Sequence, residues 1–349
     1  MKKIFLILPV AVVLYGCAGA PLPDVVWPEP PEEPRVKYVR SYGGQADFKK
    51  SNIAADILLG AGASATLVKP MGVHVSGEGK IYVTDTAVAD IQVWDPENKK
   101  ATTFAAKGAK EFYKPISVAT DKEGRIFVTD SQGDRVVVFD KDYKIESYLE
   151  PEEPFKQPSG IAANEATNRL YVTDTHKHDI TVFELDSLKY LKTIGKRGSE
   201  EGEFNFPSHI TTDHDGNLYV VDTMNARVQI FDPDGNFLSA FGQFGDAPGM
   251  FARPKGIAVD SEGHIYVVDA AFNNVQIFDR EGQVLLAFAG FGGGRGELIL
   301  PAGMAIDDKD FIYVVDQWNE RVQVFEYLGE KHRAREAAAE GEGKKKKKK

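Results

Sequence analysis

Short apolar runs separated by turn residues recur along most of the chain. The clearest case is residues 253–288, where GIAV, IYVV, VQIF and VLLAF are separated by DSEG, by a polar loop and by DREG. Runs of four to six residues rich in β-branched and aromatic side chains, bounded by Asp and Gly, predict strands joined by tight hairpins. The stretch therefore predicts a four-stranded antiparallel sheet. A single such sheet leaves one face uncovered, so it needs neighbours of the same kind.

The same unit occurs six times at a nearly constant spacing. The second run of each unit ends in an aspartate, at steps of 45, 44, 48, 47 and 47 residues: Asp85, Asp130, Asp174, Asp222, Asp269 and Asp316. A proline precedes each first run: Pro70, Pro115, Pro158, Pro207, Pro254 and Pro301. A period in the forties with four strands per unit is typical of a β-propeller. We therefore predict an all-β fold, a six-bladed β-propeller of four-stranded antiparallel blades.

The two ends of the repeated region predict how the ring closes. The sixth unit contains PAGMAI, IYVVD and RVQVF, but then continues into the helix-prone EKHRAREAAAE without a fourth run. The segment VKYVRSYGG (residues 36–44) matches the fourth-strand pattern LLAFAGFGG (residues 285–293). We predict that an N-terminal strand over residues 35–43 completes the last blade, which removes an open sheet edge. The propeller then spans residues 35–327.

The N-terminus has the pattern of a secretion signal. Residues 1–16 combine Lys2 and Lys3 with an apolar core, IFLILPVAVVL, that is too short to span a bilayer as an ordinary helix. The core ends at Leu14-Tyr15-Gly16-Cys17, which resembles the bacterial lipobox, and Cys17 is the only cysteine in the chain. The resemblance implies a mature protein that begins at a lipidated Cys17. Because Ala18 rather than Asp follows, it also implies transport to the outer membrane, on the periplasmic or the surface side.

Three further segments depart from the repeat. Residues 17–34 are rich in proline and predict an extended tether, or else a ligand for a proline-reading domain. Residues 45–69 are longer than the other crossovers and include a candidate helical turn, NIAADILL, so they form either a specialised loop or a simple insertion. Residues 328–349 predict a charged tail that is helical and then disordered. Its end, Lys344–Lys349, is either solvated or held to an anionic surface or partner.

The charge balance excludes one class of function. Without Lys2 and Lys3 the chain has 40 basic and 52 acidic residues, a formal charge of −12. Without the six terminal lysines as well, the balance is 34 against 52, or −18. An acidic ring repels nucleic acid backbones, which take most of their affinity from Lys and Arg arrays. Charge and export together argue against nucleic acid as a partner.

Units such as PKGIAVDSEGHIYVVDAAFNNVQIFDREG resemble NHL repeats. The resemblance covers residues 70–325 and the N-terminal closing strand, and it implies the propeller fold. It leaves function open, because propellers of this family serve as docking surfaces for protein or RNA, and relatives include metal-dependent lyases and hydrolases.

Positions at which one blade differs from the others indicate a candidate site. Two residues after the unit proline, the six blades carry Gly72, Ser117, Gly160, His209, Gly256 and Gly303, so His209 is the exception. One residue earlier they carry Met71, Ile116, Ser159, Ser208, Lys255 and Ala302. If both rows line the channel mouth, Ser159, Ser208, His209 and Lys255 form one polar arc that could hold an anion or a carboxylate. The alternative is a water-filled channel with scattered polar groups.

We expect no metal, no cofactor and no catalytic set. The peptide-amidating lyases that share this repeat carry histidines directly after the blade proline, and this chain has none in that row. His209 is unaccompanied, whereas tetrahedral zinc needs three or four ligands, and the His176-x-His178 pair lies in a polar loop. The aspartate that ends each second strand and the Arg or Asn that opens the third recur in most blades. We therefore interpret them as structural hydrogen bonds and ion pairs.

These observations favour a non-enzymatic docking module. We expect a lipid-anchored propeller of the bacterial cell envelope that binds another envelope protein through its crossover loops and upper face. The alternative is a propeller lyase or hydrolase, or a small-ligand receptor, with its site at the channel mouth.

Overall fold

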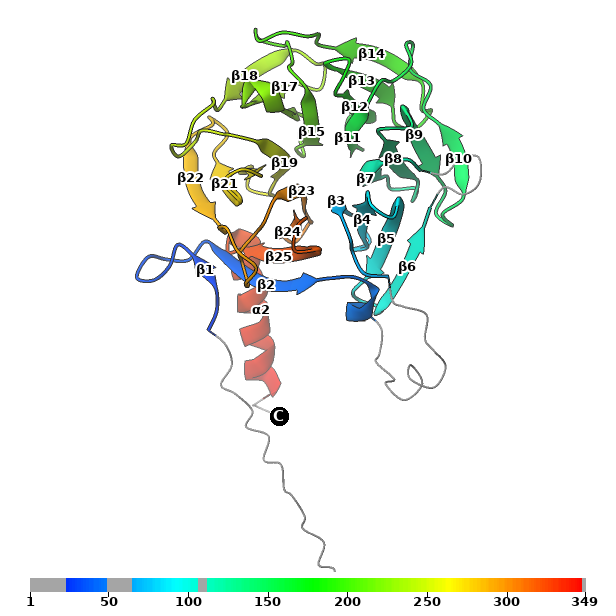
Figure 1. The fold of residues 1–349 in the computed structure, drawn as a ribbon. Helices are drawn as coiled ribbons and strands as arrows, with labels where there is room; N and C mark the ends of the chain where they lie inside the picture. The colour runs from blue at the N-terminus through cyan, green and yellow to red at the C-terminus, as the bar shows by residue number, and fades with distance from the viewer. Residues whose placement is uncertain (1–22, 49–64, 106–111, 347–349) are drawn as a thin grey trace, which may run out of the picture.

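The computed structural model is a closed ring of six antiparallel sheets around a central axis (Figure 1). It describes residues 23–48, 65–105 and 112–346. Sequence-adjacent blades pack side by side, and the first strand of each blade contacts the first strand of the next around the whole ring. The predicted fold class is confirmed.

Each blade is a meander whose first strand lies nearest the axis. The first three blades consist of β3 (Pro70–Val75), β4 (Ile81–Asp85), β5 (Asp90–Asp95) and β6 (Lys100–Phe104); β7 (Pro115–Thr120), β8 (Ile126–Asp130), β9 (Arg135–Phe139) and β10 (Ile145–Tyr148); and β11 (Pro158–Asn164), β12 (Arg169–Asp174), β13 (Asp179–Glu184) and β14 (Tyr190–Ile194).

The remaining blades follow the same order, except that the sixth takes its fourth strand from the N-terminus. They consist of β15 (Pro207–Thr212), β16 (Leu218–Asp222), β17 (Arg227–Phe231) and β18 (Phe237–Phe241); β19 (Pro254–Val259), β20 (Ile265–Asp269), β21 (Asn274–Phe278) and β22 (Val284–Phe288); and β23 (Pro301–Ile306), β24 (Phe311–Asp316), β25 (Arg321–Tyr327) and β2 (Val36–Tyr42). The described chain also contains β1 (Val26–Trp27), the 3-10 turns η1 (Gln45–Phe48) and η3 (Thr223–Asn225), and helix α2 (Glu330–Lys346).

The strand register gives the ring two different faces. In each blade the unit proline pairs with the aspartate that ends the second strand, as Pro70 does with Asp85. The loops that enter first strands and those that join second to third strands therefore share one face, which we call the crossover face. The loops that join first to second strands, and third to fourth strands in the first five blades, lie on the opposite face, the hairpin face.

The ring closes as the two chain ends predict. Strand β2 pairs antiparallel with β25, from Val36 opposite Tyr327 to Tyr42 opposite Val322. Figure 1 shows the N-terminal strand lying along the C-terminal one. Val36 is fully buried in a cluster with Phe325 and residues of the fifth blade. The closing strand therefore contributes both backbone pairing and core.

The N-terminal flank differs from the expected tether. Val26 and Trp27 form β1, a fifth strand that pairs with β2 in the last blade. The Trp27 ring lies 5.8 Å from the rings of both Phe288 and Phe325. A large aromatic side chain gains more from this burial than the proline-rich backbone gains from extension in water, so the segment docks on the ring. Cys17 and the rest of residues 1–22 lie outside the described residues, as does the candidate turn NIAADILL.

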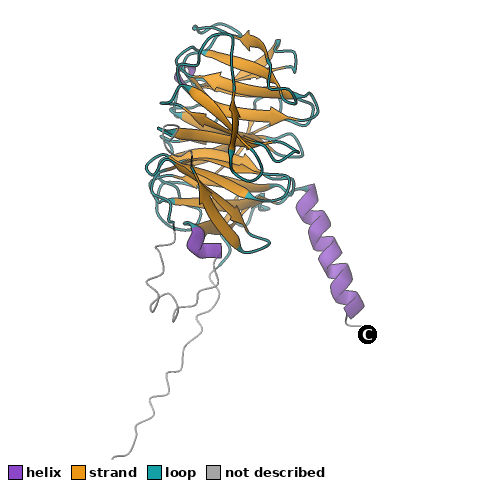
Figure 2. Cartoon of the chain, turned by 90° about the vertical axis from the view of Figure 1, so that its right-hand side faces the viewer, coloured by secondary structure: helices purple, strands orange, loops and turns teal. Residues whose placement is uncertain are grey.

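The C-terminal tail forms a longer helix than expected. Helix α2 continues through the GEG segment to Lys346, and it extends away from the hairpin face (Figure 2). Its first two turns are held to that face by contacts between Lys331 and Asp310 at 3.7 Å and between Arg335 and Glu326 at 2.6 Å. Lys347–Lys349 lie outside the described residues. Within the described part of the chain, no helix has the length and apolar content needed to cross a membrane.

Candidate functional site

Close approach of the inner strands explains the row of glycines around the axis. A Cβ added to Gly72 would lie 2.4 Å from the carbonyl oxygen of Ile116 in the next blade, and one added to Gly160 would lie 2.7 Å from that of Ser208. Neither distance is sterically tolerated, so a side chain at these positions would force the inner strands apart. This close approach accounts for the glycines that four of the six blades carry in this row.

The repeated aspartates hold each blade together rather than forming a reactive set. Asp316 is fully buried and accepts hydrogen bonds from the backbone N–H of Ile299, the Asn319 amide and the Arg321 guanidinium, the last at 2.7 Å. The second and fourth blades contain the equivalent ion pairs, Arg135 with Asp130 and Arg227 with Asp222. The structural interpretation of these positions is thus confirmed in three blades.

Two blades place a carboxyl group where three of the others have Arg and one has Asn. Asp90 faces Asp85 across the strand pair, and Asp179 faces Asp174. Burial, and then the neighbouring Asp85, raises the pKa of Asp90 to about 6. Burial likewise raises the pKa of Asp179 to about 6. The first and third blades therefore carry at this position a carboxyl group with a raised pKa, which the other blades lack.

The four residues of the predicted arc line one cavity at the axial end of the crossover face. This mouth cavity has a volume of about 310 Å³. The Ser159 hydroxyl donates to the Ser208 carbonyl at 3.0 Å, and the Ser208 hydroxyl lies 2.7 Å from the Thr223 hydroxyl. These serines therefore join neighbouring blades as well as facing the cavity.

His209 lies between the mouth cavity and a second cavity of about 200 Å³ farther along the axis, which we call the inner cavity. It lines both. Its Nδ1 is 3.2 Å from the Ser208 hydroxyl oxygen. Its Nε2 is buried and has no hydrogen-bond partner among the described residues. Burial, and then the charge of Lys255, lowers the pKa of His209 to about 3. The ring is therefore neutral at physiological pH, with one nitrogen available to a ligand.

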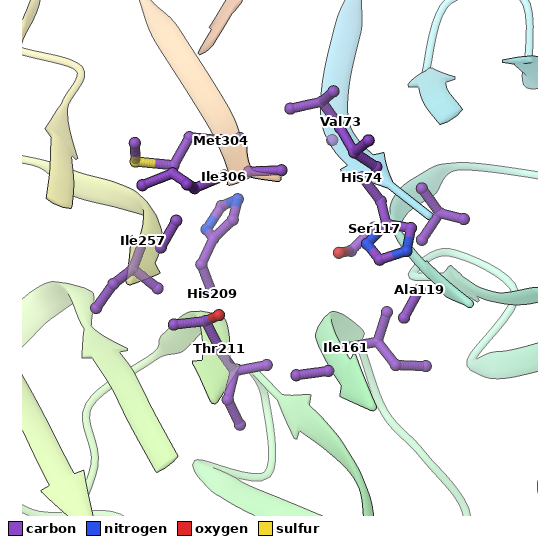
Figure 3. A pocket seen from close by; sticks show the side chains of 18 of the residues that line it. Val73, His74, Ser117, Ala119, Ile161, His209, Thr211, Ile257, Met304 and Ile306 are labelled. Carbon is purple, nitrogen blue, oxygen red and sulfur yellow. The ribbon is translucent and has the colours of Figure 1, made fainter. Parts of the chain in front are cut away.

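The structure adds His74, which the sequence comparison did not single out. Figure 3 shows the imidazoles of His74 and His209 inside the inner cavity, on opposite sides of it. His74 Nε2 is 2.8 Å from the Thr120 hydroxyl, and burial lowers its pKa to about 4. His74 is the one histidine in a row of Ala and Thr four residues after the unit proline. Comparing that row across the blades would have found it.

Lys255 is the cation of the arc, and other cations surround it. Burial, followed by the charges of Arg253, Lys69 and Lys114, lowers its pKa. Lys114 also lines the mouth cavity, together with Ser131. Lys69, Lys114 and Arg253 each directly precede a unit proline, so a comparison of that row would have shown a basic rim.

The other two histidines considered for metal binding have structural contacts. His178 Nδ1 accepts a hydrogen bond from the backbone N–H of Phe206, whose ring lies 4.5 Å from the imidazole. The His176 ring also contacts Phe206. In the part of the chain that the structure describes, no group of three or more His, Cys, Asp or Glu residues is arranged to hold a metal ion.

The two cavity histidines predict acid sensitivity. Their folded pKa values, about 3 for His209 and about 4 for His74, lie below the value near 6.5 of the unfolded chain. The unfolded state therefore binds more protons between these values, and stability is present above pH 6.5 and lost as pH falls. Between pH 7 and pH 5, the free energy of unfolding should therefore fall less in the double variant His74→Gln/His209→Gln than in the wild type. The expected difference is about 1–2 kcal/mol per histidine. Urea denaturation at the two pH values measures this difference.

His264 provides a control of opposite sign. Its hydrogen bond to Asp260, at 2.9 Å, raises its pKa. That interaction stabilises the fold at low pH and is lost as pH rises through the raised pKa. His264→Gln should therefore make the protein more sensitive to acid than the wild type. An unchanged pH dependence in the double variant would contradict the burial argument for His74 and His209.

Known proteins match parts of the repeat. Residues 155–183 and 298–325 match the NHL repeat, and residues 211–271 match a family described as 6-bladed beta-propeller. The chain is an NHL-repeat six-bladed β-propeller. Protein lin-41 of Caenorhabditis elegans is 53% identical over 47 residues, which is 14% of this chain and 4% of that protein. The match to this relative therefore spans a small part of its length.

Solved structures similar to this NHL propeller include both lyases and a binding protein. A streptogramin B lyase has a TM-score of 0.57 at 14% identity, covering 74% of this chain and 93% of its own. Virginiamycin B lyase from Staphylococcus aureus gives 0.56 at 16% identity, covering 74% and 95%. An auxiliary nutrient binding protein from Bacteroides thetaiotaomicron gives 0.59 at 15% identity, covering 75% and 70%. At these identities the likeness shows the fold alone.

Proposed function

We propose that this propeller is a non-enzymatic docking module of the bacterial cell envelope. It is anchored by a lipid on Cys17, and it binds another envelope protein through its crossover face. The observation that carries the proposal is the distribution of exposed apolar side chains over the ring.

Large apolar side chains are exposed mainly on the crossover face. The most exposed are Phe244 at 80%, Phe291 at 73% and Trp318 at 69%. The others on this face are Val68, Val88, Tyr113, Met224 and Leu300. Exposed aromatic and Met side chains around a concave centre are typical of protein interaction surfaces.

The hairpin face has the opposite character among the described residues. None of the large exposed apolar side chains lies on it, because the remaining three, Leu191, Leu238 and Leu285, are on fourth strands. Its turns carry aspartates that accept hydrogen bonds from backbone N–H groups of the same turn, as Asp260 does from the N–H of His264 at 2.9 Å. The difference between the faces favours the crossover face as the docking surface.

The position of Pro23 supports an orientation in which the crossover face points toward the membrane. The carbonyl of Pro23 accepts a hydrogen bond from Arg295 at 2.7 Å, beside the crossover between β22 and β23. Pro23 is six positions after Cys17, and six extended residues span about 20 Å. A lipid on Cys17 would hold the crossover face near the membrane, which raises its effective concentration toward a partner there.

Site-specific photocrosslinking in the native envelope tests the docking surface. A photoreactive phenylalanine analogue at Trp318 or Phe244 should crosslink to the same envelope protein. The same analogue at Leu238 or Leu285, which are also about half exposed on the outer strands, should not. Phe291→Asp should then reduce the yield from Trp318 because it puts a charge into the apolar surface.

Two results would overturn the docking proposal. One is crosslinking from the outer strands with none from the crossover face. The other is a yield from Trp318 that Phe291→Asp leaves unchanged. The lipid is tested separately, since Cys17→Ser should release the protein from membranes while leaving the ring folded.

A small-ligand receptor with its site at the channel mouth is a second candidate. It is favoured by the unpartnered Nε2 of His209, a residue that lines both axial cavities. A receptor site and a docking surface can coexist, because the cavity lies at the axis and the exposed apolar side chains lie on the surrounding loops.

A further inference from the structure

The mouth cavity gathers positive charge on an acidic protein. Lys114 and Lys255 line it, although they belong to opposite blades of the ring, and the charges of Lys69 and Arg253 also act on Lys255. Among the described residues, none of these four cations forms an ion pair with a carboxylate. No carboxylate neutralises them, so an anion in the cavity would be attracted by their combined positive charge.

The cavity also contains an unused hydroxyl group. The Ser131 side chain is only 3% exposed, and its hydroxyl oxygen has no hydrogen-bond partner in the described part of the chain. A buried polar group without a partner costs free energy unless a ligand or water satisfies it. Ser131 follows the second strand of the same blade that supplies Lys114, so a single bound group can interact with both residues.

Apolar atoms make up most of the accessible surface of the cavity, although Ser159, Ser208 and His209 also line it. Met71 and Ile116 face the cavity, and the methylene chains of the two lysines add to the apolar surface. The volume of about 310 Å³ is at the lower end of the range for small-ligand sites. The site therefore suits a ligand with one anionic group and an apolar body.

The surroundings favour a carboxylate over a phosphate. Phosphate sites commonly use free backbone N–H groups or arginine forks. Here the N–H of Lys114 is already bound to the Asp130 carboxylate at 2.7 Å. The Asp130 carboxylate is itself paired with Arg135, so this guanidinium is not free to form a fork with a phosphate.

We propose that the mouth cavity binds an apolar carboxylic acid, with its carboxylate at Lys255, Lys114 and the Ser131 hydroxyl and its apolar body against Met71 and Ile116. The acid is either a free small molecule or the C-terminal residue of a protein. This inference rests on the receptor candidate and not on the docking function, so the two can fail separately.

Isothermal titration with a matched pair of ligands tests the charge requirement. Benzoate and benzamide have nearly the same shape, but only benzoate is anionic at pH 7. Benzoate should bind the full-length protein in low salt, and benzamide should not. Lys255→Met keeps the apolar chain and removes the charge, so it should weaken benzoate binding at least about tenfold. Ser131→Ala should weaken it by a smaller factor.

A control variant separates a local site from overall charge. Lys309 is exposed on the hairpin face, and Lys309→Met changes the net charge as Lys255→Met does. It should leave benzoate binding unchanged. The proposal is overturned if benzoate fails to bind the wild type, if benzamide binds equally well, or if Lys309→Met weakens benzoate binding as much as Lys255→Met.

Further titrations distinguish the source of the carboxylate. If the ligand is a protein C-terminus, the peptide acetyl-Gly-Ser-Leu-Phe with a free carboxylate should bind more tightly than benzoate, and its C-terminal amide should not bind. If the ligand is a free acid, benzoate should bind more tightly than the peptide. Inorganic phosphate that binds more tightly than either would overturn the choice of a carboxylate. If crosslinking from the crossover face fails while benzoate still binds, only the docking function is contradicted, and the carboxylate site stands.

Discussion

A chain that lacks residues 24–42 should not form a stable ring. The deletion removes β1 and β2, so it leaves the outer edge of β25 unpaired, while the other edge stays paired with β24. It also exposes Phe325, which is fully buried in the intact blade. The loss of a whole strand from a domain with a typical stability of about 5–15 kcal/mol should exceed about 5 kcal/mol. Circular dichroism and urea denaturation should show a largely unfolded or aggregated protein.

Complementation distinguishes loss of the strand from a general failure of expression. A synthetic peptide of residues 23–44, added during refolding, should pair with β25 and restore the cooperative transition. A peptide in which Val36 is replaced by Asp should not restore it, because position 36 is fully buried. Arg40→Ser in the peptide is the control, since Arg40 is exposed. A deleted chain that unfolds like the wild type would refute the closure argument.

The second large effect should arise at the buried aspartates. Asp316→Asn is expected to lower the free energy of unfolding by about 3 kcal/mol, because it removes the charge that pairs with Arg321. The Asp316 side chain is fully buried and that of Arg321 is only 17% exposed, so water would compensate the remaining guanidinium only in part. Urea denaturation at pH 7 measures the difference from the wild type.

Asp85→Asn is the matched control for this substitution. Asp85 is also fully buried, but it accepts hydrogen bonds from backbone N–H groups such as that of Val68 at 2.7 Å. It faces Asp90, whose raised pKa reflects repulsion from Asp85 as well as burial. Removing the charge at Asp85 relieves this repulsion, so the expected loss is about 1 kcal/mol or less. Equal losses at the two positions would show that the ion pair with Arg321 adds no stability.

The sequence predicted the blades well because each blade is a local structure. Four strands joined by short hairpins need only period-two alternation and turn residues, which stand next to one another along the chain. The constant spacing of Asp85 and its five equivalents then predicted the number of blades. The closing strand was predictable because the sixth unit lacked a fourth run and residues 36–44 supplied one.

Contacts between distant segments were harder to predict. Trp27 lies within a proline-rich segment, and nothing around it indicates that its ring reaches Phe288 and Phe325 more than 250 positions away. Likewise, Lys114 and Lys255 come from blades on opposite sides of the ring. They approach each other only because a closed ring of six blades brings its inner strand ends to one axis.

By itself, the sequence determined the fold class, the six blades, the closing strand and the polar arc of Ser159, Ser208, His209 and Lys255, because repeats expose each departure from the common pattern. Only the tertiary structure decided that this arc lines one cavity with Lys114 and Ser131, that His74 lies across the axis from His209, and that exposed aromatic side chains gather on one face. Those features depend on distances between blades. Strand periodicity sets which side of a sheet a residue faces, but ring closure sets which residues meet.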